Sequence, residues 1–272
     1  MLKVTLLMDD QKNDELLSEH GFSVFLETEN EKILFDTGQS SNFIKNSKKL
    51  NIKLGDLDAV VLSHGHYDHV NGLSFLLDEY YIKRLFVGEN FFKKKYKELP
   101  NGELLYRGAN FTSESLKNIK INYIKADKTE IFKDVFIIKN FKRLTEFEKD
   151  NPIFKVKETD GFKIDNFSDE ISLVIKVEGK LNVFIGCAHP GVINMLLFIS
   201  SLFEEKIGMV YGGIHLKDSS QFKIEKTLDY LHNLNIPFYH LLHCTGSTAT
   251  KKIARKGIIN NRNIKVGETI YL

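Results

Sequence analysis

The 272-residue sequence contains few of the residues that mark several classes of protein. It has two cysteines, four prolines and no tryptophan. The cysteines, Cys187 and Cys244, are too few for the disulfide framework of a small secreted domain. The N-terminus turns acidic at Asp9 and lacks the apolar core and cleavage site of a signal peptide. We therefore expect a cytoplasmic protein.

The sequence also lacks a strong excess of either charge and lacks a long apolar run. Its 38 basic and 36 acidic residues leave a net charge of +2, which gives no electrostatic reason to expect nucleic acid or an anionic membrane as partner. The basic run 93–97, KKKYK, is typical of a solvated helix face. The longest apolar run, 192–203, is too short for a bilayer and predicts a buried helix. A small-molecule substrate is the expected partner, and the sequence does not reveal the oligomeric state.

Strands and helices alternate towards both ends of the chain. Residues 22–38 predict two strands joined by a polar turn, and 40–50 a short helix with a serine N-cap. Residues 171–189 predict a second hairpin, around Glu178 and Gly179, followed by a helix that Pro190 opens. The repeated order of hairpin, strand and helix predicts an α/β or α+β fold in which two sheets stack with helices outside.

The region from about 90 to 168 has weak periodicity. It predicts strands and loops inserted as a cap, or lid, over a site. Because no linker rich in glycine, serine or proline divides the chain, we expect one domain spanning 1–272.

Four ligand-type side chains crowd into the stretch LSHGHYDHVNGL, residues 62–73. They are His64, His66, Asp68 and His69. Histidine and aspartate are ligands for zinc and similar cations. His64 and His66 lie two apart at the end of a strand, so they point the same way if the strand geometry continues that far, and Gly65 leaves room between them. A single such residue is commonly a satisfied polar group or a helix cap, but burying four without a cation would be costly.

Three more histidines lie where apolar strands end and helix signals follow, namely His189, His215 and His243. Ligand sites in layered α/β folds collect at such strand ends. The remaining histidines, His20, His232 and His240, lack this setting. We expect them to be structural or surface residues.

The segment HGHYDH matches the H-x-H-x-D-H signature of the metallo-β-lactamase-fold superfamily, and ILFDTG, GCAHPG and HCTG resemble its other motifs. With EHGFSVFLE and GGIHL, they resemble one branch of it. Members of that branch are described as metal-dependent hydrolases of β-lactamase superfamily II or as 7,8-dihydropterin-6-methyl-4-(β-D-ribofuranosyl)aminobenzene-5′-phosphate synthase-like proteins. The resemblance covers nearly the whole chain and is weakest from about 90 to 165. It implies a four-layer αββα sandwich of two mixed sheets.

Carried over residue by residue, the resemblance implies two metal sites. The ligands would be His64, His66 and His189 for the first, and Asp68, His69 and His243 for the second. Asp36 would orient a histidine ligand from behind. Zinc is the expected metal, because redox di-iron versions of the motif carry Glu at the position of His66; manganese and iron are the alternatives.

His215 stands where the superfamily commonly has an aspartate that bridges the two metals. Either water alone bridges them, or the second site is weak and only one metal is bound. His215 would then be a substrate-binding or acid/base residue. Cys187 and Cys244 are expected to be small buried thiols, with Cys187 as a third metal ligand the alternative.

Three functions follow. In the first, a metal-bound hydroxide, available near neutral pH, hydrolyses a small anionic substrate. Asp68 would bind metal and accept a proton, and His215 would help to stabilise negative charge. Thr245 and Gly246, where a helix opens, would cradle phosphate or carboxylate, and Arg143 would add charge unless it forms a surface ion pair.

The second function, implied by the branch, is a synthase that joins a pterin carrying pyrophosphate to an aryl-ribose phosphate. The third is a non-catalytic, metal-dependent binding protein. The full ligand complement argues against the third function, because a structural zinc needs only four ligands.

Overall fold

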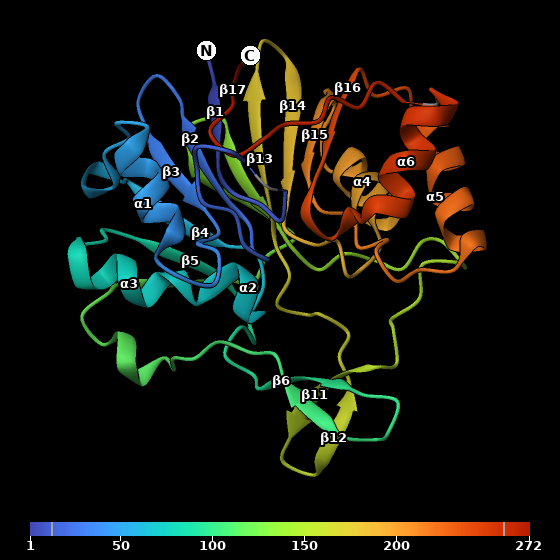
Figure 1. Ribbon diagram of the computed structural model, residues 1–272, viewed down its shortest axis with the longest axis horizontal. Coiled ribbons are helices and arrows are strands. Elements are labelled where there is room, and N and C mark those ends of the chain that lie inside the picture. Colours follow the sequence, from blue (N-terminus) through green and yellow to red (C-terminus); the bar gives the residue numbers. More distant parts are fainter. Residues whose placement is uncertain (12, 258) are drawn as a thin grey trace. The chain divides into compact units, whose positions relative to one another are not determined.

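The structure is a computed structural model that describes residues 1–11, 13–257 and 259–272. The chain forms two compact units, each of which is built from segments that are distant in the sequence (Figure 1). The first unit contains Met1–Lys125, Asp150–Glu170 and Lys265–Leu272, and the second contains Ala126–Lys149 and Ile171–Ile264. The H-x-H-x-D-H segment belongs to the first unit, whereas His189, His215 and His243 belong to the second.

The main sheet of the first unit has seven strands in the order β17-β1-β2-β3-β4-β5-β8. Their bounds are β1 Lys3–Met8, β2 Ser23–Glu27, β3 Lys32–Phe35, β4 Ala59–Leu62, β5 Leu85–Gly88, β8 Ile121–Ile124 and β17 Thr269–Tyr271. Strands β17, β1, β2 and β3 pair antiparallel, and β3, β4, β5 and β8 pair parallel. The loops that follow β3 and β4 therefore leave from the same edge of the sheet.

Helices of the first unit cover one face of this sheet. They are α1 Asn42–Lys49, α2 Tyr67–Val70 and α3 Gly72–Glu79, with 3-10 turns at Leu54–Asp56 and Glu114–Leu116. Phe43 of α1 and Leu73 and Leu76 of α3 share a buried cluster with Val60 and Leu62 of β4. Each buried side chain of this size stabilises the fold by about 1.5–3 kcal/mol, so the cluster gives the H-x-H-x-D-H loop a rigid base.

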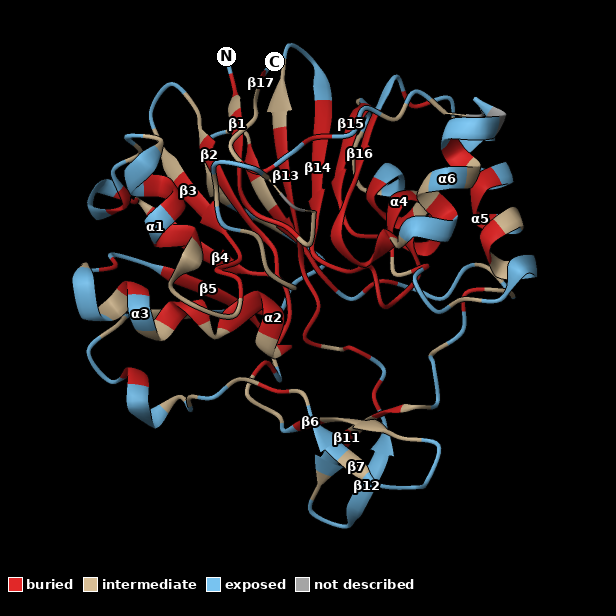
Figure 2. Cartoon of the chain, in the orientation of Figure 1, coloured by how far each residue is buried: buried red, intermediate tan, exposed pale blue. Residues whose placement is uncertain are grey.

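A smaller antiparallel sheet in the same unit has the order β12-β11-β6-β7. Its strands are β6 Lys95–Glu98, β7 Leu104–Tyr106, β11 Phe154–Glu158 and β12 Gly161–Ile164. Figure 2 shows that β12 is exposed along its length, whereas β6 begins at a buried residue, Lys95. The interpretation of KKKYK as a solvated helix face is therefore wrong. The run enters a strand, and one of its lysines is buried because it meets two aspartates.

The sheet of the second unit has six strands in the order β16-β15-β14-β13-β10-β9. Their bounds are β9 Lys128–Phe132, β10 Val135–Ile138, β13 Ser172–Val177, β14 Lys180–Ile185, β15 Lys206–Gly212 and β16 Phe238–Leu241. Strands β14, β15 and β16 are parallel neighbours, so the segments that follow them leave from one edge. The helices are α4 Val192–Ser201, α5 Gln221–Asn233 and α6 Ser247–Lys256, with a 3-10 turn, η3, at His243–Thr245.

The helices of the second unit bury their apolar sides against its sheet. Ile193 and Leu196 of α4, Leu228 of α5 and Ile253 of α6 join one core cluster with Val183 of β14. The apolar run 192–203 thus forms a buried helix, as predicted. Within the described ranges, every helix is too short or too polar to cross a membrane.

One predicted helix start differs from the structure, and a second has the predicted N-cap residue without its capping hydrogen bond. Helix α4 begins at Val192, two residues after Pro190, and its N-cap is Gly191 with a φ of 96°. The buried carboxylate of Glu148 accepts the N–H groups of Ile193 and Asn194 and so satisfies the first turn. Ser41 is the N-cap of α1, but its side chain makes no capping hydrogen bond.

Candidate metal centre

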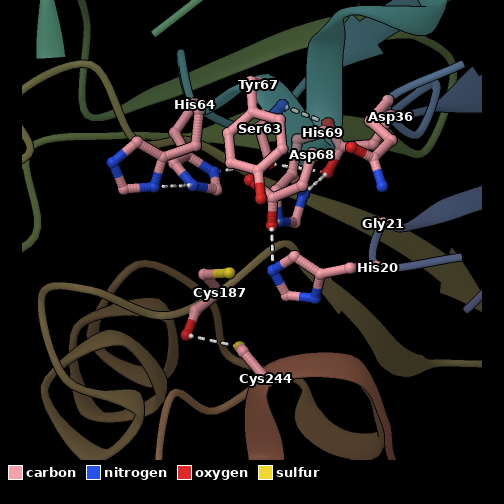
Figure 3. A network of polar contacts seen from close by, with 12 residues as sticks. His20, Gly21, Asp36, Ser63, His64, Tyr67, Asp68, His69, Cys187 and Cys244 are labelled. Carbon is pink, nitrogen blue, oxygen red and sulfur yellow. Dashed lines mark hydrogen bonds and ion pairs between the residues drawn. The ribbon is translucent and has the colours of Figure 1, made fainter. Parts of the chain in front are cut away.

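The four ligand-type residues of the H-x-H-x-D-H segment lie together where β4 ends and α2 begins. His64 and His69 are fully buried, and His66 and Asp68 nearly so. Nε2 of His64 lies 3.1 Å from Nδ1 of His66, and the ring centres of His64 and His69 are 4.4 Å apart (Figure 3). Two nitrogens bound to one tetrahedral zinc ion lie ~3.3 Å apart, given bonds of about 2.0–2.1 Å. The facing nitrogens of His64 and His66 therefore fit a single cation.

Asp36 orients two of these histidines from behind. Its carboxylate is fully buried and accepts hydrogen bonds from His69 Nδ1 at 2.6 Å, from Ser63 Oγ at 2.7 Å and from the Ser63 backbone N–H at 2.7 Å. The Ser63 hydroxyl has one proton, which goes to Asp36, so it accepts from His64 Nδ1 at 2.9 Å. Both rings thus turn Nε2 away from Asp36, which is the arrangement of a carboxylate behind metal-bound imidazole.

Asp68 and His69 form a second convergent pair. Oδ2 of Asp68 lies 3.7 Å from Nε2 of His69. The same oxygen lies 3.3 Å from Nε2 of His20, whose Nδ1 contacts Asp10 at 2.8 Å. The sequence reasoning missed His20 and Asp10, because they lie in a polar loop with no periodic signal.

Burial controls the charge of His64. It lowers the pKa of this imidazole well below its usual range, and the neighbouring His69 and His66 lower it further. The ring is therefore neutral at neutral pH. Neutral imidazole is the form that binds a metal, because its nitrogen keeps a lone pair.

A buried cluster of charges supports the loop between the two histidines of H-x-H. Lys95 Nζ lies 2.7 Å from Asp165 Oδ2 and 2.8 Å from Asp169 Oδ1, and all three side chains are buried. The other oxygen of Asp169 accepts the Gly65 N–H at 2.8 Å. Burial alone would lower the pKa of Lys95, but the charges of Asp169 and Asp165 raise it. A Cβ on Gly65 would lie 2.6 Å from the Phe91 carbonyl oxygen, so glycine is required, as expected.

The three histidines of the second unit that the sequence singled out follow three neighbouring parallel strands. His189 follows β14, His215 follows β15 and His243 follows β16. His189 and His243 are buried, and the ring centres of His189 and His215 lie 4.2 Å apart. His215 and His243 have φ angles of 48° and 50°, a conformation that non-glycine residues rarely adopt and that concentrates at functional sites.

Both cysteines are buried, as expected, and lie beside these histidines. Burial raises the pKa of the Cys244 thiol, but hydrogen bonds with Cys187 and His215 and the charge of His243 outweigh burial and hold the pKa well below its usual range. This environment differs from the inert setting expected of a small buried thiol.

The predicted substrate residues have different settings. Thr245 is buried, and its hydroxyl has no hydrogen-bond partner among the described residues. Gly246 precedes α6 with a φ of 78°, and a Cβ there would lie 2.5 Å from Lys217 Cα. Arg143 is exposed, and its Nη1 donates to the Phe141 carbonyl oxygen at 3.0 Å.

The sequence is similar to a known protein family and to a named protein. A family model described as the metallo-beta-lactamase superfamily matches residues 19–165. A Methanocaldococcus jannaschii protein named 7,8-dihydropterin-6-methyl-4-(beta-D-ribofuranosyl)-aminobenzene-5'-phosphate synthase is 30% identical over 265 residues, which cover 91% of this chain and 89% of that protein.

Two solved structures share the fold of this chain. The crystal structure of a protein described as a metal-dependent hydrolase of the beta-lactamase superfamily matches with a TM-score of 0.88 and 31% identity, covering 100% of this chain and 99% of that one. Zn²⁺-bound PqqB from Methylobacterium extorquens matches with a TM-score of 0.59 and 12% identity, covering 99% of this chain and 100% of that one.

Proposed function

The chain belongs to the metallo-β-lactamase superfamily and has its fold, and we propose that it is a metal-dependent hydrolase of a small, phosphate- or carboxylate-bearing substrate. One observation carries the proposal. The buried Asp36 carboxylate orients His69 directly and His64 through Ser63, so that both rings present Nε2 for a cation. Burying so many polar groups costs free energy unless a bound ligand compensates for the loss.

The proposed metal ligands are those that the family motif implies. His64, His66 and His189 hold one metal, and Asp68, His69 and His243 hold the other. Imidazole nitrogens and a carboxylate suit zinc, with manganese and iron as alternatives. When bound, zinc lowers the pKa of a water molecule to about 7 and polarises the oxygen of a substrate.

Asp68 is the proposed proton acceptor. Its Oδ2 contacts both His69 Nε2 and His20 Nε2, so it can bind metal while remaining connected to a second titratable group. His20 bridges Asp68 and Asp10, which gives a proton a path away from the centre through the two ring nitrogens. This path explains why a partly exposed histidine outside the motif lies against a motif carboxylate.

The start of α6 is the proposed anion-binding element. This helix has ten residues, and the backbone N–H groups of its first turn are suited to phosphate or carboxylate. The buried Thr245 hydroxyl, which has no partner among the described residues, supplies a further donor, and Gly246 lets the backbone approach closely. The exposed Arg143 would add positive charge.

Metal loading and turnover test the proposal together. We expect the zinc-loaded protein to hydrolyse members of a panel of phosphodiesters, carboxylic esters and lactones, and a chelator to abolish this activity. His66→Ala should bind fewer zinc ions per chain and lose turnover, whereas the matched control His232→Ala, at an exposed helix position, should change neither. A His66→Ala protein that retains zinc content and turnover would contradict the proposal.

A synthase is the second candidate, favoured by the name of the 30% identical relative from Methanocaldococcus jannaschii. In this reaction the metals would stabilise a pyrophosphate leaving group instead of supplying a nucleophile. The protein should be incubated with a pterin pyrophosphate, with and without an aryl-ribose phosphate. Pyrophosphate release that requires the acceptor indicates the synthase, and release without it indicates hydrolysis. Absence of turnover on this pair and on the ester panel would favour a binding protein.

A further inference from the structure

Cys187, His215 and Cys244 form a cluster of metal-ligand side chains within the second unit. The two Sγ atoms and one ring nitrogen all lie within 4.8 Å of one another. The three residues follow β14, β15 and β16, which are parallel neighbours, so the sheet itself brings them to one edge. None of the three is among the six ligands that the family motif implies.

Backbone groups hold Cys244 Sγ in place. The His215 N–H donates to this sulfur at 3.3 Å. The Cys244 thiol contacts the Cys187 carbonyl oxygen at 3.7 Å (Figure 3). A Cβ on Gly213 would lie 2.5 Å from the same sulfur, so only glycine leaves room for it. N–H donation to sulfur favours the thiolate, which is the form that binds metal.

The backbone at the cluster adopts conformations that the rest of the fold must hold in place. His215 has a φ of 48°, and Ala188 and His243, which adjoin the two cysteines, have φ angles of 59° and 50°. Left-handed conformations are unfavourable for residues with a Cβ, and they persist where the surrounding structure imposes them. The left-handed residues are thus His215 itself and one neighbour of each cysteine.

We propose that Cys187, His215 and Cys244 bind a zinc ion whose fourth position is open. In a tetrahedral site with Zn–S of about 2.3 Å and Zn–N of about 2.0–2.1 Å, the donor atoms lie ~3.5–3.8 Å apart, so the cluster needs only small side-chain rotations. Binding of Zn²⁺ releases to solvent any proton that the two cysteines carry, and the two thiolates leave the site neutral. Two thiolates and an imidazole select zinc over magnesium or manganese.

The zinc site does not depend on the proposed function. Its ligands all lie in the second unit, and none of them is a ligand of the two motif sites. It assigns a ligand role to His215, the residue that stands where the family commonly has a bridging aspartate. The acid/base and charge-stabilising roles predicted for His215 from the sequence then fall to other groups. The two cysteines become ligands instead of core-filling thiols.

Cobalt provides the first test, because a thiolate bound to Co²⁺ gives an intense near-ultraviolet charge-transfer band. The full chain, kept reduced with a phosphine, should show this band on addition of Co²⁺. A His64→Ala/His69→Ala variant, which lacks ligands of both motif sites, should keep it. Cys187→Ser and Cys244→Ser, each in that background, should lose it. A band that survives Cys244→Ser, or that vanishes in the double-alanine background, would overturn the independent site.

Replacing His215 with another ligand-type residue distinguishes metal ligation from a purely structural role. His215→Ala should lose the cobalt band, whereas His215→Cys, which offers a third thiolate, should restore it. Failure of His215→Cys to restore the band, with an unchanged far-ultraviolet circular dichroism spectrum, argues against ligation by residue 215.

Zinc X-ray absorption of the unmodified chain keeps the proposal falsifiable if the serine variants fail to fold. With three equivalents of Zn²⁺ per chain, the average zinc shell should contain sulfur at about 2.3 Å. A shell of nitrogen and oxygen alone would overturn the proposal. So would a thiol titration that finds Cys187 and Cys244 already joined as a disulfide under the same reducing conditions.

Discussion

Asp169 accepts the backbone N–H of Gly65 at 2.8 Å, although 104 positions separate the two residues in the sequence. Gly65 is the residue between His64 and His66. Asp169 also binds Lys95 at the start of β6, so the segment that follows β12 and the small four-stranded sheet both support the H-x-H loop. Lys95 and Asp165, which belong to the region predicted as a cap, thus take part in a network that holds the loop between two predicted metal ligands.

Removing this carboxylate should weaken zinc binding. Asp169→Ala leaves the Gly65 N–H without its acceptor, so His64 and His66 no longer hold their nitrogens 3.1 Å apart. Groups that orient ligands are commonly worth about 10–100-fold in metal affinity, and we expect a loss near the lower end. Competition with a chromogenic chelator measures it. Asp160→Ala, in the exposed turn of the β11–β12 hairpin, is the matched control, and equal zinc affinities of the two variants would refute the role of Asp169.

Lys95 should matter more for stability than for metal binding. Lys95→Met removes the only positive charge that contacts both Asp165 and Asp169 among the described ion pairs, leaving two buried carboxylates close together. Breaking a buried ion pair on one side costs about 3–5 kcal/mol of unfolding free energy. Urea denaturation should show this loss, and Lys94→Met, one residue earlier and exposed, should change stability little. Equal midpoints for the two variants would contradict the prediction.

Asp36→Asn tests the carboxylate that orients His69 and, through Ser63, His64. The amide can accept the Ser63 N–H, but its NH₂ group then faces donors that previously met a second oxygen. Zinc affinity should fall by about 10–100-fold while the fold persists. Zinc content per chain after dialysis, compared with Asp56→Asn at an exposed turn, provides the measurement. Full zinc occupancy in Asp36→Asn would show that the geometry of the histidines does not need the charge.

Local patterns predicted the elements whose residues are contiguous in the sequence. The hairpins β2–β3 and β13–β14 were readable from alternation and turn residues. The convergence of His64, His66, Asp68 and His69 was readable because one short loop carries all four. The start of α4 was misassigned because its first turn is satisfied by Glu148, which lies more than 40 positions earlier.

Long-range contacts were beyond sequence reasoning for a physical reason. Lys95 resembled a solvated lysine because its sequence neighbours are lysines, and its burial becomes favourable only when Asp165 and Asp169 arrive from 70 and 74 positions away. His20 similarly acquires its significance from Asp68, which lies on a different element. Ser63 resembled the end of a strand, yet its hydroxyl links Asp36 to His64.

His240 gives a prediction about pH. Burial lowers the pKa of this histidine, with a further contribution from the charge of Arg262, while its hydrogen bond to the Arg262 carbonyl oxygen opposes the shift. The unfolded chain therefore takes up a proton near pH 6.5 while the folded chain does not. Because the unfolded state binds more protons in this window, the unfolding free energy of the metal-free protein falls as pH drops below about 6.5.

The contribution of His240 to that pH dependence can be isolated by replacement. His240→Gln cannot titrate, so its unfolding free energy should fall less steeply between pH 7 and pH 5 than that of the unmodified protein. Urea denaturation in the presence of a chelator, at several pH values, measures the slope. His232→Gln, at an exposed position of α5, is the matched control for replacing a histidine with glutamine. Identical slopes for His240→Gln and the unmodified protein would mean that His240 exchanges its proton equally in both states.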